Sequence, residues 1–215
     1  MDSPARAQQL SQGREQECFI MSKKEFIEIY QRNIRRNGSK ELLKWLEGTD
    51  FFKAPASTKY HSAHEGGLCE HSLNVYRFFY QEILQRASEF SGLKCLDTDT
   101  EEMVAVCALL HDVCKVNKYV LHSRNIKNEA TGQWEKVPYY SIEENKFPYG
   151  HGEGSVWLIQ RFMRLSLEES IAIRWHMGGF DDAAKGYDLS AAFRQFPNAM
   201  LLHIADMKAT YLLDR

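Results

Sequence analysis

No run of apolar residues in this sequence is long enough to cross a bilayer, which excludes an ordinary membrane-spanning helix. The polar start Met1-Asp2-Ser3-Pro4 does not resemble a secretory signal peptide. An excess of charge of one sign is also missing, because 27 Lys and Arg residues face 29 Asp and Glu residues, for a formal net charge of -2. This balance predicts no extended nucleic-acid surface and no general attraction to anionic membranes, so any phosphate binding must be local.

Paired cysteines are absent as well. The five cysteines include no C-x-x-C spacing and their number is odd, which argues against a disulfide framework. At 215 residues the chain can bury a sizeable core without disulfide support. We therefore expect a cytoplasmic protein with reduced, mostly structural thiols at Cys18, Cys69, Cys95, Cys107 and Cys114.

Helical periodicity fills most of the sequence. Residues 1–21 lack this periodicity and are predicted to form a flexible N-terminal tail, followed by a single domain over residues 22–215 that starts with a helical extension. Ser22 and Glu25 have the spacing of a capping box, which predicts that the first helix begins at Ser22.

The helical pattern is interrupted between residues 119 and 148. Two runs rich in β-branched and aromatic residues, Tyr119–Lys127 and Trp134–Ile142, flank a short polar segment. This arrangement predicts either a β-hairpin inserted into a helical domain or an irregular loop of the same length. The predicted fold class is therefore all-α, a helical bundle with a small β-hairpin insert around residues 119–148.

One apolar run, residues 105–110, ends abruptly in polar residues. His111 and Asp112 follow it at once, and Lys115 comes three positions later. Adjacent residues on a helix point about 100° apart, so the two side chains cannot both face the core, but both can lean toward one ion beside the helix. An isolated His-Asp pair is more often a polar helix end that arises by chance, so the interpretation depends on the rest of the chain.

Three further histidines, His71, His151 and His176, lie near the ends of expected helices and beside glycine or apolar residues. Asp206 is surrounded by apolar residues, where an unpaired carboxylate would be very costly to bury. Neutral imidazoles and carboxylates together suit divalent metals such as Mn, Fe, Co, Ni or Zn. Six ligands exceed the needs of one catalytic ion, and they fit two ions that share a bridging carboxylate.

The order of these residues, together with Gly-Gly-Leu-Cys-Glu-His-Ser-Leu at 66–73 and Leu-Leu-His-Asp-Val-Cys-Lys at 109–115, resembles the HD-domain superfamily of metal-dependent phosphohydrolases. The similarity covers residues 58–213 and is closest in motif to the HD domain of YhaM-type 3′–5′ exoribonucleases. It implies an all-helical HD-domain fold with the metal site at the centre of the bundle. It also implies a first ion held by His71, His111, Asp112 and Asp206, with Asp112 bridging to a second ion held by His151 and His176.

Residues outside this ligand set also bear on the site. Lys115 matches the lysine of the family's His-Asp-x-x-Lys motif, which reaches substrate phosphate, although a solvated lysine after a helix end is the alternative. His61 could contact phosphate or donate a proton to the leaving oxygen, or it could be a polar surface residue, and the same choice applies to His64. Arg174 and Lys208 are further candidate phosphate contacts, for which solvation is the ordinary expectation.

Two features differ from specialised members of the family. Cyclic-dinucleotide hydrolases carry a Gly-Tyr-Pro motif where this chain continues from His176 as Met177-Gly178-Gly179, so that specialisation is not expected. The exoribonuclease type has an OB-fold domain before its HD domain, and the segment that precedes the similarity here is too short and too helical for one.

The sequence therefore predicts a phosphohydrolase in which a metal-activated water attacks a phosphomonoester or phosphodiester, with Asp112 positioning the water and Lys115 stabilising charge on the phosphate. The expected substrate is a small phosphorylated molecule, a nucleotide or short oligonucleotide. Two alternatives remain open. One is a mixed-valent di-iron oxygenase of the myo-inositol oxygenase type, which uses a similar four-His, two-Asp set, and the other is a non-catalytic nucleotide-binding sensor.

The insert connects the helix that ends at His111-Asp112 to the segment that carries His151, so its base is expected near these ligands. Its aromatic residues Trp134 and Tyr140 could stack on a substrate base or sugar, a contact worth ~1–3 kcal/mol per stacked base. The alternative is a hairpin that only covers the flank of the bundle.

Overall fold

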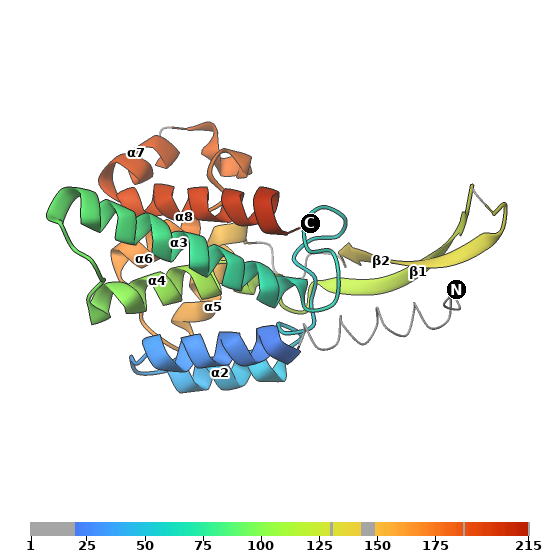
Figure 1. Cartoon of the computed structure of the whole chain (residues 1–215), viewed down its shortest axis with the longest axis horizontal. Coiled ribbons are helices and arrows are strands. Elements are labelled where there is room, and N and C mark those ends of the chain that lie inside the picture. The colour runs from blue at the N-terminus through green and yellow to red at the C-terminus, as the bar shows by residue number, and fades with distance from the viewer. Residues whose placement is uncertain (1–19, 130, 143–148, 187, 215) are drawn as a thin grey trace.

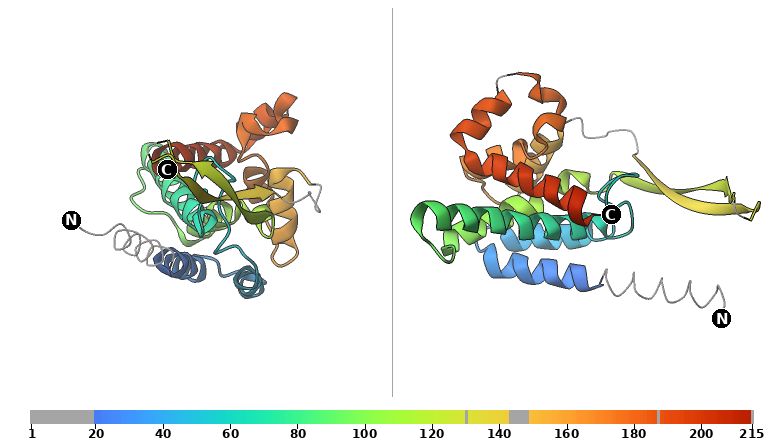
Figure 2. Two further views of the ribbon diagram at one scale, coloured as in Figure 1. Left: turned by 90° about the vertical axis from the view of Figure 1, so that its right-hand side faces the viewer. Right: turned by 45° about the horizontal axis from the view of Figure 1, so that its top comes forward.

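The computed structural model describes residues 20–129, 131–142, 149–186 and 188–214. In these residues the chain is mostly helical and contains one two-stranded antiparallel sheet. The helices form a bundle, and the hairpin of β1 (Tyr119–Lys127) and β2 (Trp134–Ile142) projects from one end of it (Figures 1 and 2). A helical fold with a small hairpin insert, as the sequence predicts, is confirmed. Among the described residues, no helix has both the length and the apolar character needed to cross a membrane.

The first helix begins earlier than its sequence predicts. Residues 20–33 are helical, so the helix already contains two residues before Ser22, and the predicted start at Ser22 is wrong. The rest of the predicted flexible tail, residues 1–19, lies outside the described residues. Glu25 does not close a capping box but forms an ion pair with Arg77 of the next long helix, at 2.8 Å. A tertiary contact has therefore replaced the local one that the spacing predicted.

The core of the bundle is formed by α3 (Gly67–Ser91), α4 (Thr98–Leu110) and α8 (Pro197–Lys208), with α3 packed against both others (Figure 1). All residues of α4 from Val104 to Leu110 are buried, as expected for a helix that is apolar on every side. Asp97 caps α4, because its side chain accepts a hydrogen bond from a backbone N–H of the first turn at 2.8 Å.

The remaining helices surround this core. α2 (Ser39–Gly48) and the helix of residues 20–33 lie side by side on one flank (Figures 1 and 2). Several helices follow the hairpin in the sequence. They are α5 (His151–Gln160), α6 (Leu167–Arg174), η2 (Gly178–Phe180), η3 (Asp182–Lys185), α7 (Asp188–Gln195) and, after α8, the π-helix η4 (Ala209–Leu213).

A close approach of α5 and α6 depends on one glycine. A Cβ atom on Gly152 would lie 2.2 Å from the carbonyl oxygen of Arg174, the last residue of α6. Only glycine fits at such a distance. The start of α5, which carries His151, is thereby brought beside the end of α6, which His176 follows.

The insert is a regular hairpin. β1 (Tyr119–Lys127) and β2 (Trp134–Ile142) pair in the register Tyr119 opposite Ile142 through Lys127 opposite Trp134. The strand bounds match the two runs recognised in the sequence, and the alternative of an irregular loop is excluded for these residues. The rest of the predicted insert, residues 143–148, lies outside the described residues.

Candidate metal centre

The structure brings all six predicted ligands together from separate helix ends. Two of them follow directly after α4 and precede the short helix η1 (Val113–Lys115), while the others come from the start of α3, the start of α5, the turn after α6, and α8. In chain order they are His71, His111, Asp112, His151, His176 and Asp206. Residues up to 135 positions apart in sequence therefore meet because their helices pack in one bundle.

Asp112 lies at the centre of the cluster, and its two carboxylate oxygens face different histidines. Oδ2 lies 3.4 Å from His111 Nε2 and 3.7 Å from His71 Nε2. Oδ1 lies 2.6 Å from His151 Nε2 and 3.5 Å from His176 Nε2. The carboxylate thus separates two pairs of histidines, which is the arrangement that a bridging ligand requires.

Asp206 joins the first pair, with its Oδ1 3.2 Å from His71 Nε2. The ligand atoms fall into overlapping groups of three, and within each group they lie within 4.8 Å of one another. Such buried groups could hold metal ions. The groups are His71–His111–Asp206, His111–Asp112–His176 and Asp112–Cys114–His151.

Two of the histidines are oriented by hydrogen bonds from their far nitrogens. His111 Nδ1 donates to the carbonyl oxygen of Ala108 at 2.8 Å, and His176 Nδ1 donates to that of Ile173 at 2.7 Å. Because a carbonyl oxygen only accepts, the neutral ring carries its proton on Nδ1 and directs the Nε2 lone pair toward Asp112. Bonds of this kind fix the tautomer and orientation of metal-binding histidines.

Two observations test whether a metal ion fits this arrangement. His176 Nε2 is buried and has no hydrogen-bond partner among the described residues, and an unpartnered buried nitrogen is costly. His71 Nε2 and His111 Nε2 face each other at 3.2 Å, a separation at which two ring nitrogens need a proton or a cation between them. Divalent cations bound between these nitrogens and the carboxylates would satisfy all three nitrogens, so the donor set fits metal ions.

The cluster is buried but not sealed. The side chains of His71, His111, Asp112 and His176 are at most 2% exposed, whereas His151 is 26% exposed. Asp206 and Lys115 also reach solvent in part. A small molecule would therefore reach the cluster past these partly exposed side chains.

The charges in the cluster are mutually stabilising. Burial alone would raise the pKa of Asp112, but Lys115, at 2.6 Å from its Oδ2, and His111 hold that pKa well below its usual range. Burial likewise opposes ionisation of Asp206, but its hydrogen bond with His71 lowers its pKa. Both carboxylates are ionised at neutral pH and available as ligands.

Two histidines, His71 and His151, are positively charged at neutral pH in the absence of metal, with a proton on each ring nitrogen. Burial lowers the pKa of His71, but its pairing with Asp206 outweighs this and raises the value to about 9. Burial also opposes the charge on His151, yet Cys114 and Asp112 raise its pKa to about 10. By linkage, these charged rings stabilise the metal-free fold below the unfolded-state pKa of ~6.5, and the contribution is lost as the pH rises through these raised values.

We predict that metal affinity increases with pH between about 6 and 8. Both rings are charged over this range, so each must lose a proton when its Nε2 becomes a ligand. Every proton displaced tightens the dissociation constant ~10-fold per pH unit. Calorimetric titration in buffers of different ionisation enthalpy counts the protons released, and an affinity that does not change with pH would contradict the ligand roles of His71 and His151.

Two contacts of the cluster were not recognised in the sequence. Cys114, expected to be structural, places its Sγ 3.6 Å from His151 Nδ1; burial raises the pKa of this thiol, but His151 outweighs the effect and lowers it. Asp214 places Oδ2 2.5 Å from His71 Nδ1. The position of Cys114 two residues after Asp112 was a usable signal, whereas nothing local in the sequence distinguishes Asp214.

His61 lies at the edge of the cluster, with its ring centroid 5.0 Å from that of His71. Its Nε2 is buried and has no hydrogen-bond partner among the described residues. The next residue, Ser62, is buried with φ at 42°, a left-handed conformation that non-glycine residues rarely adopt. His64 does not join the cluster, because it is exposed and its Nε2 lies 3.5 Å from Glu70.

The two basic residues proposed as phosphate contacts have other partners. Arg174 pairs with Glu153 at 2.5 Å and with Asp181 at 2.6 Å. Lys208 pairs with Glu82 on α3. Both side chains are therefore engaged in ion pairs that join structural elements, and neither is directed to the cluster by these contacts.

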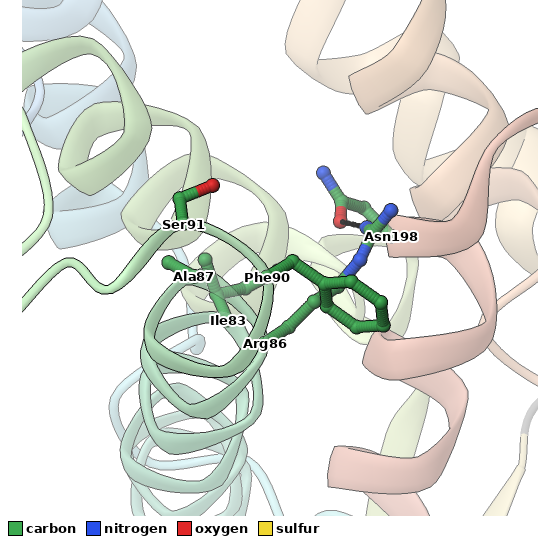
Figure 3. A pocket seen from close by; sticks show the side chains of 6 residues that line it. All are labelled: Ile83, Arg86, Ala87, Phe90, Ser91 and Asn198. Carbon is green, nitrogen blue, oxygen red and sulfur yellow. Dashed lines mark hydrogen bonds between the residues drawn. The ribbon is translucent and has the colours of Figure 1, made fainter.

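A surface pocket at the opposite end of α3 offers no comparable chemistry. It is lined by Ile83, Arg86, Ala87, Phe90, Ser91 and Asn198, and Arg86 donates to the side-chain oxygen of Asn198 at 3.2 Å (Figure 3). Its lining residues on α3 lie three or more turns beyond His71, roughly 18 Å or further along the helix. No carboxylate, thiol or imidazole is among them.

The chemistry assigned to the cluster thus rests on its motifs and its geometry. Comparisons of this chain with models of known protein families, with curated proteins and with solved structures found no match.

Proposed function

We propose that this protein is a metal-dependent phosphohydrolase of the HD-domain type, which binds two divalent ions and hydrolyses a phosphate ester of a nucleotide or a short oligonucleotide. The observation that carries the proposal is the split environment of Asp112. One of its oxygens faces His71 and His111, and the other faces His151 and His176. A carboxylate in this position can serve two ions at once.

Each proposed ion would have its own set of ligands. Two divalent ions held in this way would lower the pKa of a bound water and would stabilise charge on the oxygens of a phosphate ester. The first would be held by His71, His111, Asp206 and Asp112 Oδ2, and the second by His151, His176 and Asp112 Oδ1. Cys114 lies close enough to His151 to support the second set.

The remaining residues would bind and orient the phosphate. Lys115 is partly exposed and places its ammonium group beside Asp112, where it can neutralise negative charge on phosphate oxygens. Burial raises the pKa of Tyr119 to about 12 against the opposing effect of nearby Lys115. This phenol therefore stays protonated at neutral pH, and its hydroxyl is already bonded to the Ala56 carbonyl at 3.2 Å.

His61 is better suited to binding than to proton donation. Burial, followed by the charges of His71 and Lys115, lowers the pKa of His61 to about 4. The ring is therefore neutral at pH 7 and offers an N–H or a lone pair, but not the extra proton of an imidazolium. We propose that His61 hydrogen-bonds to a phosphate oxygen or to the attacking water, and that it does not donate a proton to the leaving oxygen.

The base of the hairpin lies near the site, since Tyr119 at the start of β1 interacts electrostatically with Lys115 and Asp112. The rings of Tyr119 and Tyr140 meet edge to face with centroids 6.5 Å apart. Trp134 pairs with Lys127 at the other end of the nine-residue strands, which is roughly 27 Å along β1 from Tyr119. A mononucleotide with its phosphate at the cluster therefore cannot reach Trp134, although the sequence made this residue and Tyr140 equal candidates.

We predict that Tyr140→Ala weakens the kcat/KM for a nucleotide substrate ~10-fold, by loss of a stacking contact, and leaves that for p-nitrophenyl phosphate unchanged. Trp134→Ala is the matched control and should change neither value for a mononucleotide. Equal losses on both substrates for Tyr140→Ala would remove the hairpin base from substrate recognition.

The proposal is tested by elemental analysis of protein purified without added metal, followed by assays of product release across a panel of nucleotides and dinucleotides. Each assay is run with Mn, Ni, Co, Fe or Zn. Hydrolysis of at least one phosphate ester that depends on the metal supports the proposal. Metal-bound protein that hydrolyses none of the panel would overturn it.

A further inference from the structure

The carboxylate of Asp214 lies directly behind the proposed metal centre. Its side chain is fully buried, and its two oxygens have separate partners. Oδ2 lies 2.5 Å from His71 Nδ1, and Oδ1 accepts from Asn74 Nδ2 at 2.7 Å. Asp214 is too far behind His71 to be a ligand of the same ion, because it bonds the nitrogen that points away from His111 and Asp206.

The π-helix η4 brings Asp214 to this position. The backbone N–H of Asp214 donates to the carbonyl oxygen of Ala209, five residues earlier, at 3.0 Å. The wider turn adds a residue relative to an α-helix, and such turns occur often at functional sites. η4 packs against α3 (Figure 1), so a residue 143 positions away in sequence meets His71 near the start of that helix.

The donors and acceptors around Asp214 leave only one consistent arrangement. Arg77 can only donate, and its Nη1 lies 2.7 Å from Asn74 Oδ1, so the amide of Asn74 turns its NH₂ group toward Asp214. Glu25 holds Arg77 in place with two contacts of 2.8 Å. Asp214 therefore accepts at both oxygens, and His71 must carry a proton on Nδ1.

We propose that Asp214 is a positioning residue that fixes the tautomer and orientation of His71 for metal binding. The proton on Nδ1 leaves the Nε2 lone pair of the neutral ring free to face His111 and Asp206. His111 and His176 have backbone carbonyls in the same place, whereas His71 depends on a side chain. This inference rests on the proposed metal centre and adds a residue that does not touch the ion.

The test compares metal affinity in three variants of the full chain. Asp214→Asn leaves one acceptor oxygen for two donors, so one of the two proposed sites should lose affinity for Mn or Co ~10–100-fold, the usual cost of losing such an outer partner. Adding Asn74→Asp to this variant exchanges the two groups and restores every donor to an acceptor. The double variant should recover affinity to within ~3-fold of wild type.

Asn74→Ala is the control for a purely structural role. It removes the outer partner of Asp214 but keeps the bond to His71, so it should lower the stability of the metal-free protein and leave metal affinity within ~3-fold of wild type. The Co spectrum of each variant reports the ligands directly. Should Asp214→Asn not fold, the double variant still decides, since weak metal binding in that folded protein overturns the proposal.

The outcomes separate this inference from the proposed function. Wild-type protein that binds no divalent ion would overturn the metal centre itself. Wild-type protein that binds ions, with Asp214→Asn binding them equally well, would overturn only the role of Asp214. An affinity loss that is the same in Asp214→Asn and Asn74→Ala would also overturn it, since both would then act through stability alone.

Discussion

Replacing Asp112 by Ala is expected to remove both proposed metal ions and to lower the proposed phosphate-ester hydrolysis ~10³-fold or more, because one carboxylate faces both halves of the cluster. His111→Ala should have a similar effect, since His111 belongs to two of the three ligand groups. Both variants should keep their helical fold, which circular dichroism can establish, because the apolar residues of α4 are unchanged.

The control for these variants is Asp97→Asn, which alters a carboxylate at the opposite end of the same helix, where it only caps α4. It should retain both ions and full activity. Asp112→Asn separates loss of charge from loss of packing, because the amide keeps the shape of the side chain. Wild-type turnover by Asp112→Ala or His111→Ala at matched metal content would show that the site is wrongly assigned.

His151→Ala and His176→Ala are each expected to lose one metal ion and to keep the other. Both residues face Asp112 Oδ1, whereas the group of His71, His111 and Asp206 contains neither of them. Titration with Mn or Co should therefore give two ions per chain for wild type and one for each variant. Activity should fall ~10²-fold or more, because the proposed two-ion contact with phosphate would be lost.

His122→Ala is a suitable control, since His122 lies in the hairpin and stacks on Tyr139 with ring centroids 5.5 Å apart. It should bind two ions. A wild-type protein that saturates at one ion, with no further loss on substitution of His151 or His176, would reduce the centre to a mononuclear one.

Much of the fold followed from local patterns. The bounds of β1 and β2 match the two sequence runs because segments rich in aromatic and β-branched residues, separated by a short polar segment, are a strand signal. The start of the first helix could not be predicted from local patterns, because Glu25 forms an ion pair with Arg77 and does not close a capping box with Ser22. Local propensity cannot reveal that a distant side chain competes for the same group.

Some residues of the candidate site could likewise be predicted from the sequence, and others could not. His111, Asp112 and Asp206 could be found because polar residues in apolar runs need an explanation. Cys114 was assigned to the core because a thiol in an apolar segment resembles any small hydrophobic residue. Asp214 gave no signal, since its importance comes only from the packing of η4 against α3.

The two other functions weighed from the sequence stay predictions. A di-iron oxygenase would take up oxygen and contain iron after purification without added metal. A sensor would bind nucleotides tightly without turning them over. The metal panel described above, read out with an oxygen electrode and by calorimetry with a nucleotide, separates both from a phosphohydrolase.

The most direct measurement is the rate of nucleotide hydrolysis by chelator-treated protein as metal is returned in fractions of one equivalent. Because Asp112 is proposed to bridge two ions, the rate should stay low through the first equivalent and rise with the second, and reach a plateau at two ions per chain. Hydrolysis that is complete at one equivalent, or that persists in the chelated protein, would contradict a dinuclear phosphohydrolase centre.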